Sequence, residues 1–260
     1  LRASGRVDVR SGVVVDRDEE DASGVVVSLR EMATGARGRE RAERAYLACG
    51  PIATTRLVLA SLDAFDRRVE LKDSQYFLLP WLRFRGVPSP RREALHTLCQ
   101  LFVELRDPTV DAHNVHLQVY TYNDLYAKLF DRLLGPAAGL AAPLVDALLA
   151  RMLLIQGYLH SRSSPAIDAT LRRDGDDAVL ELVGRPNPRT RPAIRRVAAR
   201  LARHARSFGA LPLYPALRVA PPGRGYHSGG SFPMRRRPDD LETDVLGRPR
   251  GLSRVHLVDA

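Results

Sequence analysis

Short apolar runs separated by polar turns open the chain and predict β-strands. The segments "RVDVRSGVVVDRD" and "GVVVSLREM" contain β-branched runs of strand length. The segment "YLACGPIATTRLVLAS" then predicts a strand, a turn at Gly50 and a helix that begins near Thr54. In α/β proteins, such a turn often places a nucleotide cofactor against the helix N-terminus. Many turns of this kind bind nothing, so both interpretations stay open on this segment alone.

Residues 64–222 have a different pattern. "SQYFLLPWLRF" predicts a strand with a proline interruption, and "RREALHTLCQLFVEL" has apolar residues at helical spacing. "NVHLQVYTYND" alternates, which predicts a strand with an apolar and a polar face. The polar face carries His116, Gln118, Tyr120 and Tyr122. This face either lines a substrate pocket or is exposed to water.

The rest of the middle region adds strands and helices. "LLIQGYLHS" and "AVLELVG" predict two strands, and "RPAIRRVAARLARHARSFG" predicts a helix that ends at Gly209. The apolar stretch Leu133–Leu154 is interrupted by proline, glycine and charge, so we expect amphipathic helices packed on the sheet instead of an integral membrane span. Contact with a membrane surface is the alternative. The expected fold combines α/β and α+β elements, with a mostly antiparallel sheet flanked by helices.

The charge is positive, but its distribution does not indicate a nucleic-acid partner. The net charge is +10 over 260 residues, and Lys72 and Lys128 are the only lysines. The arginines are scattered among many acidic residues, which is typical of solvated faces. A basic module that binds nucleic acid is the alternative function, and it predicts binding that weakens steeply with salt.

The metal-ligating residue types do not form a site in the sequence. Cys49 and Cys99 belong to no C-x-x-C pair. His113 and His116 are expected on opposite faces of a strand, where they cannot share an ion. We therefore expect no metal.

Both ends of the chain resemble interrupted segments. The sequence begins without methionine inside a strand-like pattern and ends in the strand-like "VHLVDA". The first residues do not have the pattern of a signal peptide, so we expect none in this segment. We expect an internal piece of a longer protein. A cytoplasmic location is favoured, although this start leaves localisation open.

One loop near the end carries chemistry. In "RGYHSGGSFPM", from Arg224 to Met234, His227 precedes two adjacent glycines. Glycines let another molecule approach the main chain closely, and an imidazole exchanges a proton near neutral pH. A plain turn whose histidine makes a structural hydrogen bond is the alternative.

Together, the two ends of the chain resemble the glucose–methanol–choline (GMC) family of flavin oxidoreductases. "RAYLACGPIATTRLVLAS" resembles the family's strand, small-residue turn and helix. "GYHSGGSFPM" followed by "DVLGRPRGLSRVHLVDA" resembles its two C-terminal elements. The matching positions are His227, Gly230, Ser231, Met234, Gly247, Arg248, Gly251, Val258, Asp259 and Ala260. Residues 64–222 match only in lying where the family has its variable substrate domain.

The resemblance implies an FAD-dependent enzyme that oxidises the CH–OH group of an alcohol or sugar. His227 matches the family's general base, which takes the hydroxyl proton while hydride passes to flavin N5. Two family features are absent: the glycine-rich N-terminal βαβ unit and the second active-site residue, which would follow Ala260. This chain alone is therefore expected to be inactive, and a catalytically inactive protein is a further alternative. The electron acceptor and the choice between oxidase and dehydrogenase are not specified.

The resemblance also implies domains and contacts. Residues 1–63 and 223–260 would form a discontinuous FAD-binding domain, and residues 64–222 the substrate domain. The implied cofactor-binding residues are Val14, Cys49, Gly50, Thr54, Asp259 and Ala260. On the polar strand face, Gln118, Tyr120 and Tyr122 are the candidate substrate-binding residues.

Overall fold

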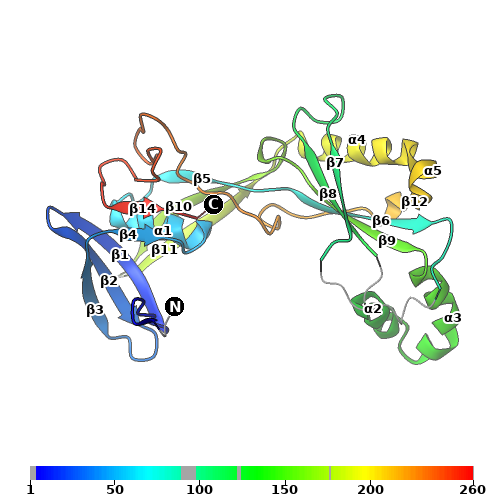
Figure 1. Ribbon diagram of the computed structural model, residues 1–260, viewed down its shortest axis with the longest axis horizontal. Helices are drawn as coiled ribbons and strands as arrows, with labels where there is room; N and C mark the ends of the chain where they lie inside the picture. The colour runs from blue at the N-terminus through cyan, green and yellow to red at the C-terminus, as the bar shows by residue number, and fades with distance from the viewer. Residues whose placement is uncertain (1–3, 89–97, 122–123, 176, 260) are drawn as a thin grey trace. The chain divides into compact units, whose positions relative to one another are not determined.

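The computed structural model describes residues 4–88, 98–121, 124–175 and 177–259 (Figure 1). The chain is a mixed α/β protein with mostly antiparallel sheets and few helices. It divides into two compact units. Unit 1 comprises Leu1–Lys72, Ile167–Gly184 and Ser228–Ala260, and unit 2 comprises Asp73–Ala166 and Arg185–His227.

Unit 1 begins with an antiparallel sheet of three strands in chain order: β1 (Val13–Asp21), β2 (Gly24–Glu31) and β3 (Arg37–Ala42). The sequence predicted β1 and β2 from their β-branched runs. Asp21 closes the turn between them, because its Oδ1 accepts hydrogen bonds from the backbone N–H of Ser23 at 2.8 Å and of Gly24 at 3.0 Å.

The predicted strand–turn–helix segment is present in unit 1. It consists of β4 (Ala45–Leu47) and α1 (Pro51–Ser61). β4 pairs in parallel with β14 (Val255–Leu257), which brings the final segment of the chain beside the first helix. Leu47, Leu57 and Val255 are buried in the core that holds these elements together.

A second sheet of unit 1 joins β5 (Arg68–Lys72), β10 (Ala166–Asp174) and β11 (Asp177–Arg185) in the order β11-β10-β5. Leu71 and Leu171 are fully buried between this sheet and α1. These three strands thus lie mostly in unit 1, although they fall within residues 64–222, the range predicted for the substrate domain. Which residues make up the functional domains stays a prediction.

Unit 2 contains a six-stranded sheet in the order β12-β6-β9-β8-β7, with β13 also paired to β6. The strands are β6 (Tyr76–Arg83), β7 (Leu101–Leu105), β8 (Val115–Tyr120), β9 (Met152–Tyr158), β12 (Ala210–Pro212) and β13 (Arg218–Val219). One face packs on α4 (Thr190–Arg203), with Trp81, Leu117 and Ile194 in the shared core. Three short helices also belong to the unit: η4 (Ser161–Ser163), η5 (Tyr214–Ala216) and α5 (Ala205–Phe208). The predicted Gly209 ends α5 at φ 63°.

Two local predictions for unit 2 were wrong. Leu101–Leu105, expected in a helix, forms β7, because Val103 pairs with Leu117 and packs against the core. Pro80 does not interrupt β6. Its carbonyl faces the side of β6 where β12 and β13 pair, and it lies in the gap between them, so its missing N–H removes no sheet hydrogen bond.

The apolar stretch forms α2 (Asp124–Leu134), η3 (Gly135–Ala137) and α3 (Ala138–Leu149). These helices pack mainly on one another, around Val145 and Leu149, and against Met152 of β9. The helical segment Tyr126–Leu149, with a mean hydropathy of 1.3, is long and apolar enough to cross a membrane by length and composition. That property is weak evidence, because core helices of soluble proteins share it.

Candidate functional site

Unit 1 contains a cavity of about 200 Å³ where α1 begins. Thr54 and Thr55 of α1 line it, together with Asp259 after β14. Ser231 also lines it and belongs to the loop from Arg224 to Met234, which we call the glycine loop. Gly230 and Met234 of the glycine loop also line the cavity. The structure therefore brings residues from both ends of the unit around one space.

The start of α1 leaves backbone groups available to this cavity. Gly50 occupies the position before the helix with φ 82°, a conformation that favours glycine. No side chain caps the helix and its first turn has no acidic residue, so its N-terminal N–H groups present partial positive charge. Asp259 lies nearby, because its Oδ2 accepts a hydrogen bond from Thr54 Oγ1.

Buried hydrogen bonds connect the glycine loop to α1. Thr55 Oγ1 donates to the carbonyl oxygen of Pro51 at 2.6 Å, so the Ser231 hydroxyl, also at 2.6 Å, donates to Thr55 Oγ1. Thr55 and Ser231 are both buried. The cavity wall is therefore a defined hydrogen-bonded arrangement and not a loose turn.

Gly247 fixes another part of the wall. Its φ is 73°, and a Cβ on it would lie 2.5 Å from the carbonyl oxygen of Leu257. Leu257 N–H also donates to the Gly247 carbonyl at 2.8 Å. No residue other than glycine fits this position without a backbone shift.

The donor set of the cavity fits the hydroxyl-bearing part of a cofactor. The Asp259 carboxylate accepts hydrogen bonds from hydroxyl groups and repels phosphates, and no lysine or arginine lines the cavity. Complete ligand sites occupy about 300–1,000 Å³, so this smaller cavity accommodates only a portion of a dinucleotide.

The other predicted cofactor-binding residues do not line this cavity. Val14 lies on β1, where it pairs with Arg30 of β2. Cys49 is an exposed free cysteine and, like Gly50, precedes α1 outside the cavity lining. Ala260 lies outside the described residues. The cofactor roles of these residues stay predictions.

In unit 2, the sheet face opposite α4 carries polar and aromatic side chains in register. His116 of β8 pairs with Tyr158 of β9, which pairs with Tyr76 of β6. Gln118 pairs with Gln156 one step along the same strands. Because directly paired residues share a face, these side chains form one continuous surface.

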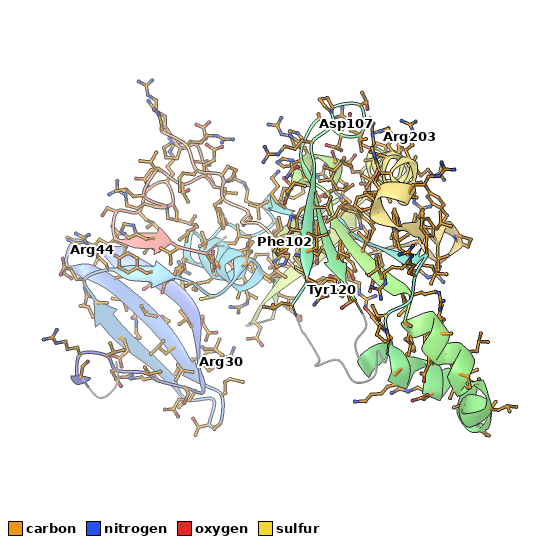
Figure 2. All side chains as sticks on the ribbon, turned by 45° about the vertical axis from the view of Figure 1, so that its right-hand side comes forward. Arg30, Arg44, Phe102, Asp107, Tyr120 and Arg203 are labelled. Carbon is orange, nitrogen blue, oxygen red and sulfur yellow. The ribbon has the colours of Figure 1, made fainter. Side chains whose placement is uncertain are left out.

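Hydrogen bonds and ring contacts connect this surface, which we call the open face. Tyr120 OH donates to Gln118 Oε1 at 2.8 Å, and Gln118 Nε2 lies 3.3 Å from His116 Nε2. Figure 2 shows Tyr120 at the end of β8 and Phe102 on the neighbouring β7. The exposed ring of His227 lies 6.0 Å from that of Tyr158. The structure therefore places His227 at the open face with Gln118 and Tyr120, while Tyr122 lies outside the described residues.

The phenols of the open face stay protonated at neutral pH. Burial raises the pKa of Tyr76, with neighbouring tyrosines adding to the effect, and burial raises the pKa of Tyr158 in the same way. A hydrogen bond from His116 lowers the pKa of the Glu104 carboxyl at the edge of the face. The face can thus donate hydrogen bonds from hydroxyl groups and present an imidazole.

Sequence reasoning missed Tyr76, Tyr158 and Tyr226, which are linked by ring contacts between Tyr76 and the other two at 5.5 Å and 5.2 Å. The alternation in "LLIQGYLHS" was the available signal for Tyr158. Within the described ranges, no group of three or more His, Cys, Asp or Glu residues is placed to hold a metal ion. His113, in the loop before β8, stacks on His160 at 4.0 Å.

Neither the known family models nor the curated proteins contain a match to this chain.

Proposed function

We propose that this chain is part of an FAD-dependent oxidoreductase that oxidises the CH–OH group of an alcohol or sugar. The observation that carries the proposal is the hydrogen bond between Thr54 and Asp259, which lie 205 positions apart in the sequence. Each belongs to a segment that resembles the GMC family, and both line the same cavity of unit 1. Two separate motif matches thus coincide in one place within one unit.

The residues of unit 1 would hold part of the cofactor. Asp259 would accept hydrogen bonds from cofactor hydroxyls, and Thr54 orients its carboxylate. The uncapped start of α1 would donate backbone N–H groups. When bound, FAD supplies the hydride acceptor for the reaction.

The residues of unit 2 would handle the substrate and its proton. His227 would take the proton from the substrate hydroxyl, since histidine is the side chain that most often serves as a general base and this imidazole is exposed. Gln118 and Tyr120 would orient the substrate by hydrogen bonds, and the tyrosine rings would contact its carbon skeleton. Hydroxyl recognition by amides and aromatic contact are suited to an alcohol or a sugar.

The nucleic-acid alternative receives less support from α4. Arg196 Nε donates to the Val110 carbonyl at 2.7 Å, and Arg200 pairs with Asp107. These arginines serve local structure, so they do not form a free basic stripe along the helix.

The test is flavin reduction by alcohols under anaerobic conditions. In the purified full-length protein of which this chain would be a part, His227→Ala is expected to retain flavin but to lose on the order of 10²-fold or more in the rate of bleaching, because positioned general bases contribute about 10²–10⁴. His204→Ala, which removes another exposed histidine of unit 2, is the matched control and should bleach like wild type. Equal rates for His227→Ala and wild type would remove His227 from the reaction. A protein that never binds flavin would contradict the proposed function itself.

A further inference from the structure

Unit 2 contains a cavity of about 690 Å³, and its lining has an excess of positive charge. Arg162, Arg189 and Arg196 line it, and Asp111 is the only carboxylate in its lining. The cavity volume lies within the range of about 300–1,000 Å³ found for small-molecule sites. Its charge is therefore complementary to a multiply charged anion.

Each of the three guanidinium groups has N–H donors that make no hydrogen bond to a described residue. Arg196 uses Nε to bond the Val110 carbonyl at 2.7 Å, which orients its remaining N–H groups. The side chains of Arg162 and Arg189 make no hydrogen bond or ion pair with any described residue. Planar guanidinium forks match the oxygen geometry of phosphate.

Ser163 adds a hydroxyl group to the wall of the cavity. The residue is buried, with 6% of its surface exposed, and it lines the cavity. Among the described residues, no group forms a hydrogen bond with its hydroxyl. An unpaired hydroxyl at the wall of a cavity is free to donate a hydrogen bond to a ligand or to solvent.

The wall that carries these groups is held in place by its backbone. Thr190 Oγ1 donates to the Ser163 carbonyl at 2.7 Å, and Asn187 Nδ2 donates to the carbonyls of Arg162 and Ser164, each at 3.0 Å. The α4 helix begins beside this wall without a side-chain cap, so its positive end adds to the field. Such preorganisation lowers the entropic cost of binding.

We infer that this cavity binds a small phosphorylated molecule through its phosphate group. Arg162, Arg189 and Arg196 would contact the phosphate oxygens, and the Ser163 hydroxyl would donate the neutral hydrogen bond. The site is distinct from the open face and does not depend on the proposed oxidation of an alcohol.

Pyrophosphate is the probe for this site, titrated into the purified protein at low ionic strength and followed by calorimetry. Wild type is expected to bind one equivalent with saturation. Arg162→Gln and Arg189→Gln are each expected to weaken binding by about tenfold or more, because each removes a charged hydrogen bond. Absence of saturable binding by the wild type would overturn the inference.

The controls separate a built site from general attraction to a basic protein. Arg195→Gln removes the same charge from an exposed position of α4 outside the cavity, so binding should change by less than about twofold. Equal weakening by Arg195→Gln and Arg189→Gln would show nonspecific binding and overturn the inference.

Ser163→Ala gives the sharpest test, because the hydroxyl has no partner among the described residues. The variant should keep the wild-type melting temperature without ligand and bind pyrophosphate about threefold to tenfold more weakly. Wild-type affinity in Ser163→Ala would show that the hydroxyl does not face a bound phosphate.

Discussion

The two candidate sites are built in different ways. The unit 1 cavity depends on hydrogen bonds between residues far apart in the sequence: a buried one between Thr55 and Ser231, and a partly buried one between Thr54 and Asp259. The open face of unit 2 depends on sheet register, which aligns His116 with Tyr158 and Tyr76. Substitutions at the cavity should therefore change stability together with function, whereas substitutions on the open face should change function alone.

The largest difference in the free energy of unfolding is expected between substitutions on the two opposite faces of β8 in unit 2. Leu117→Ala removes a fully buried side chain of the core and should cost about 3–4 kcal/mol in the free energy of unfolding. Gln118→Ala, one residue away on the open face, should cost less than about 0.5 kcal/mol. Urea denaturation of both variants measures the difference, and similar losses would show that the open face is also part of the core.

A smaller loss of stability is expected when a glycine in the wall of the unit 1 cavity is replaced. Gly247→Ala should destabilise the protein by about 2–3 kcal/mol, because it combines positive φ with a contact of 2.5 Å to the Leu257 carbonyl. Gly251→Ala is the matched control: its φ is 87° but a Cβ there meets no atom within 4 Å, so only the conformational cost of about 1–2 kcal/mol remains. Equal losses, measured by denaturation, would remove the close contact from the explanation.

A pH-dependent gain in the free energy of unfolding is expected when Asp18 of β1 is replaced by asparagine. This carboxyl is buried, neither oxygen has a hydrogen-bond partner among the described residues, and burial raises its pKa to about 6. The folded state therefore favours the protonated form, and ionisation destabilises it progressively as the pH rises from about 4 to about 6. Asp18→Asn, which stays neutral, should gain about 2 kcal/mol over wild type at pH 7.

The pH profile of that gain is its own control. Below about pH 4 the wild-type carboxyl is protonated in both states, so Asp18→Asn and wild type should differ little. Denaturation at pH 4, 5, 6 and 7 should show the difference growing and then levelling off above about pH 6. A difference independent of pH would mean that the charge on Asp18 does not cause the effect.

Sequence patterns predicted the strands whose own residues, taken within one segment, already favour a strand. The β-branched runs of β1 and β2 and the alternation of β8 correspond to strands. β7 was missed, because five residues with mixed spacing fit a helix until pairing with β8 selects the strand. Neither β5 nor β10 was predicted, since pairing between segments so distant in sequence follows from tertiary packing.

The candidate sites were only partly predictable for the same reason. Gln118 and Tyr120 were identified from strand alternation, but Tyr158 and Tyr76 join them through a register that no single segment specifies. Thr54 and Asp259 came from a family resemblance, and their contact depends on the parallel pairing of β4 with β14. Ser163 lies in the polar segment "HSRSSPAI", whose sequence alone does not distinguish a pocket from a solvated loop, and only the fold places its hydroxyl at a cavity wall.

The central claim is that the unit 1 cavity holds part of a flavin cofactor, and the visible absorbance of the purified full-length protein, of which this chain would be a part, tests it most directly. The account predicts flavin absorbance in wild type and a large loss of bound flavin in Asp259→Ala, because the carboxylate would no longer accept hydrogen bonds from the cofactor. Asp239→Ala, which removes an exposed carboxylate of the same unit outside the cavity lining, should retain the absorbance. A colourless wild type that binds no added FAD, or an Asp259→Ala variant with full flavin content, would contradict the account.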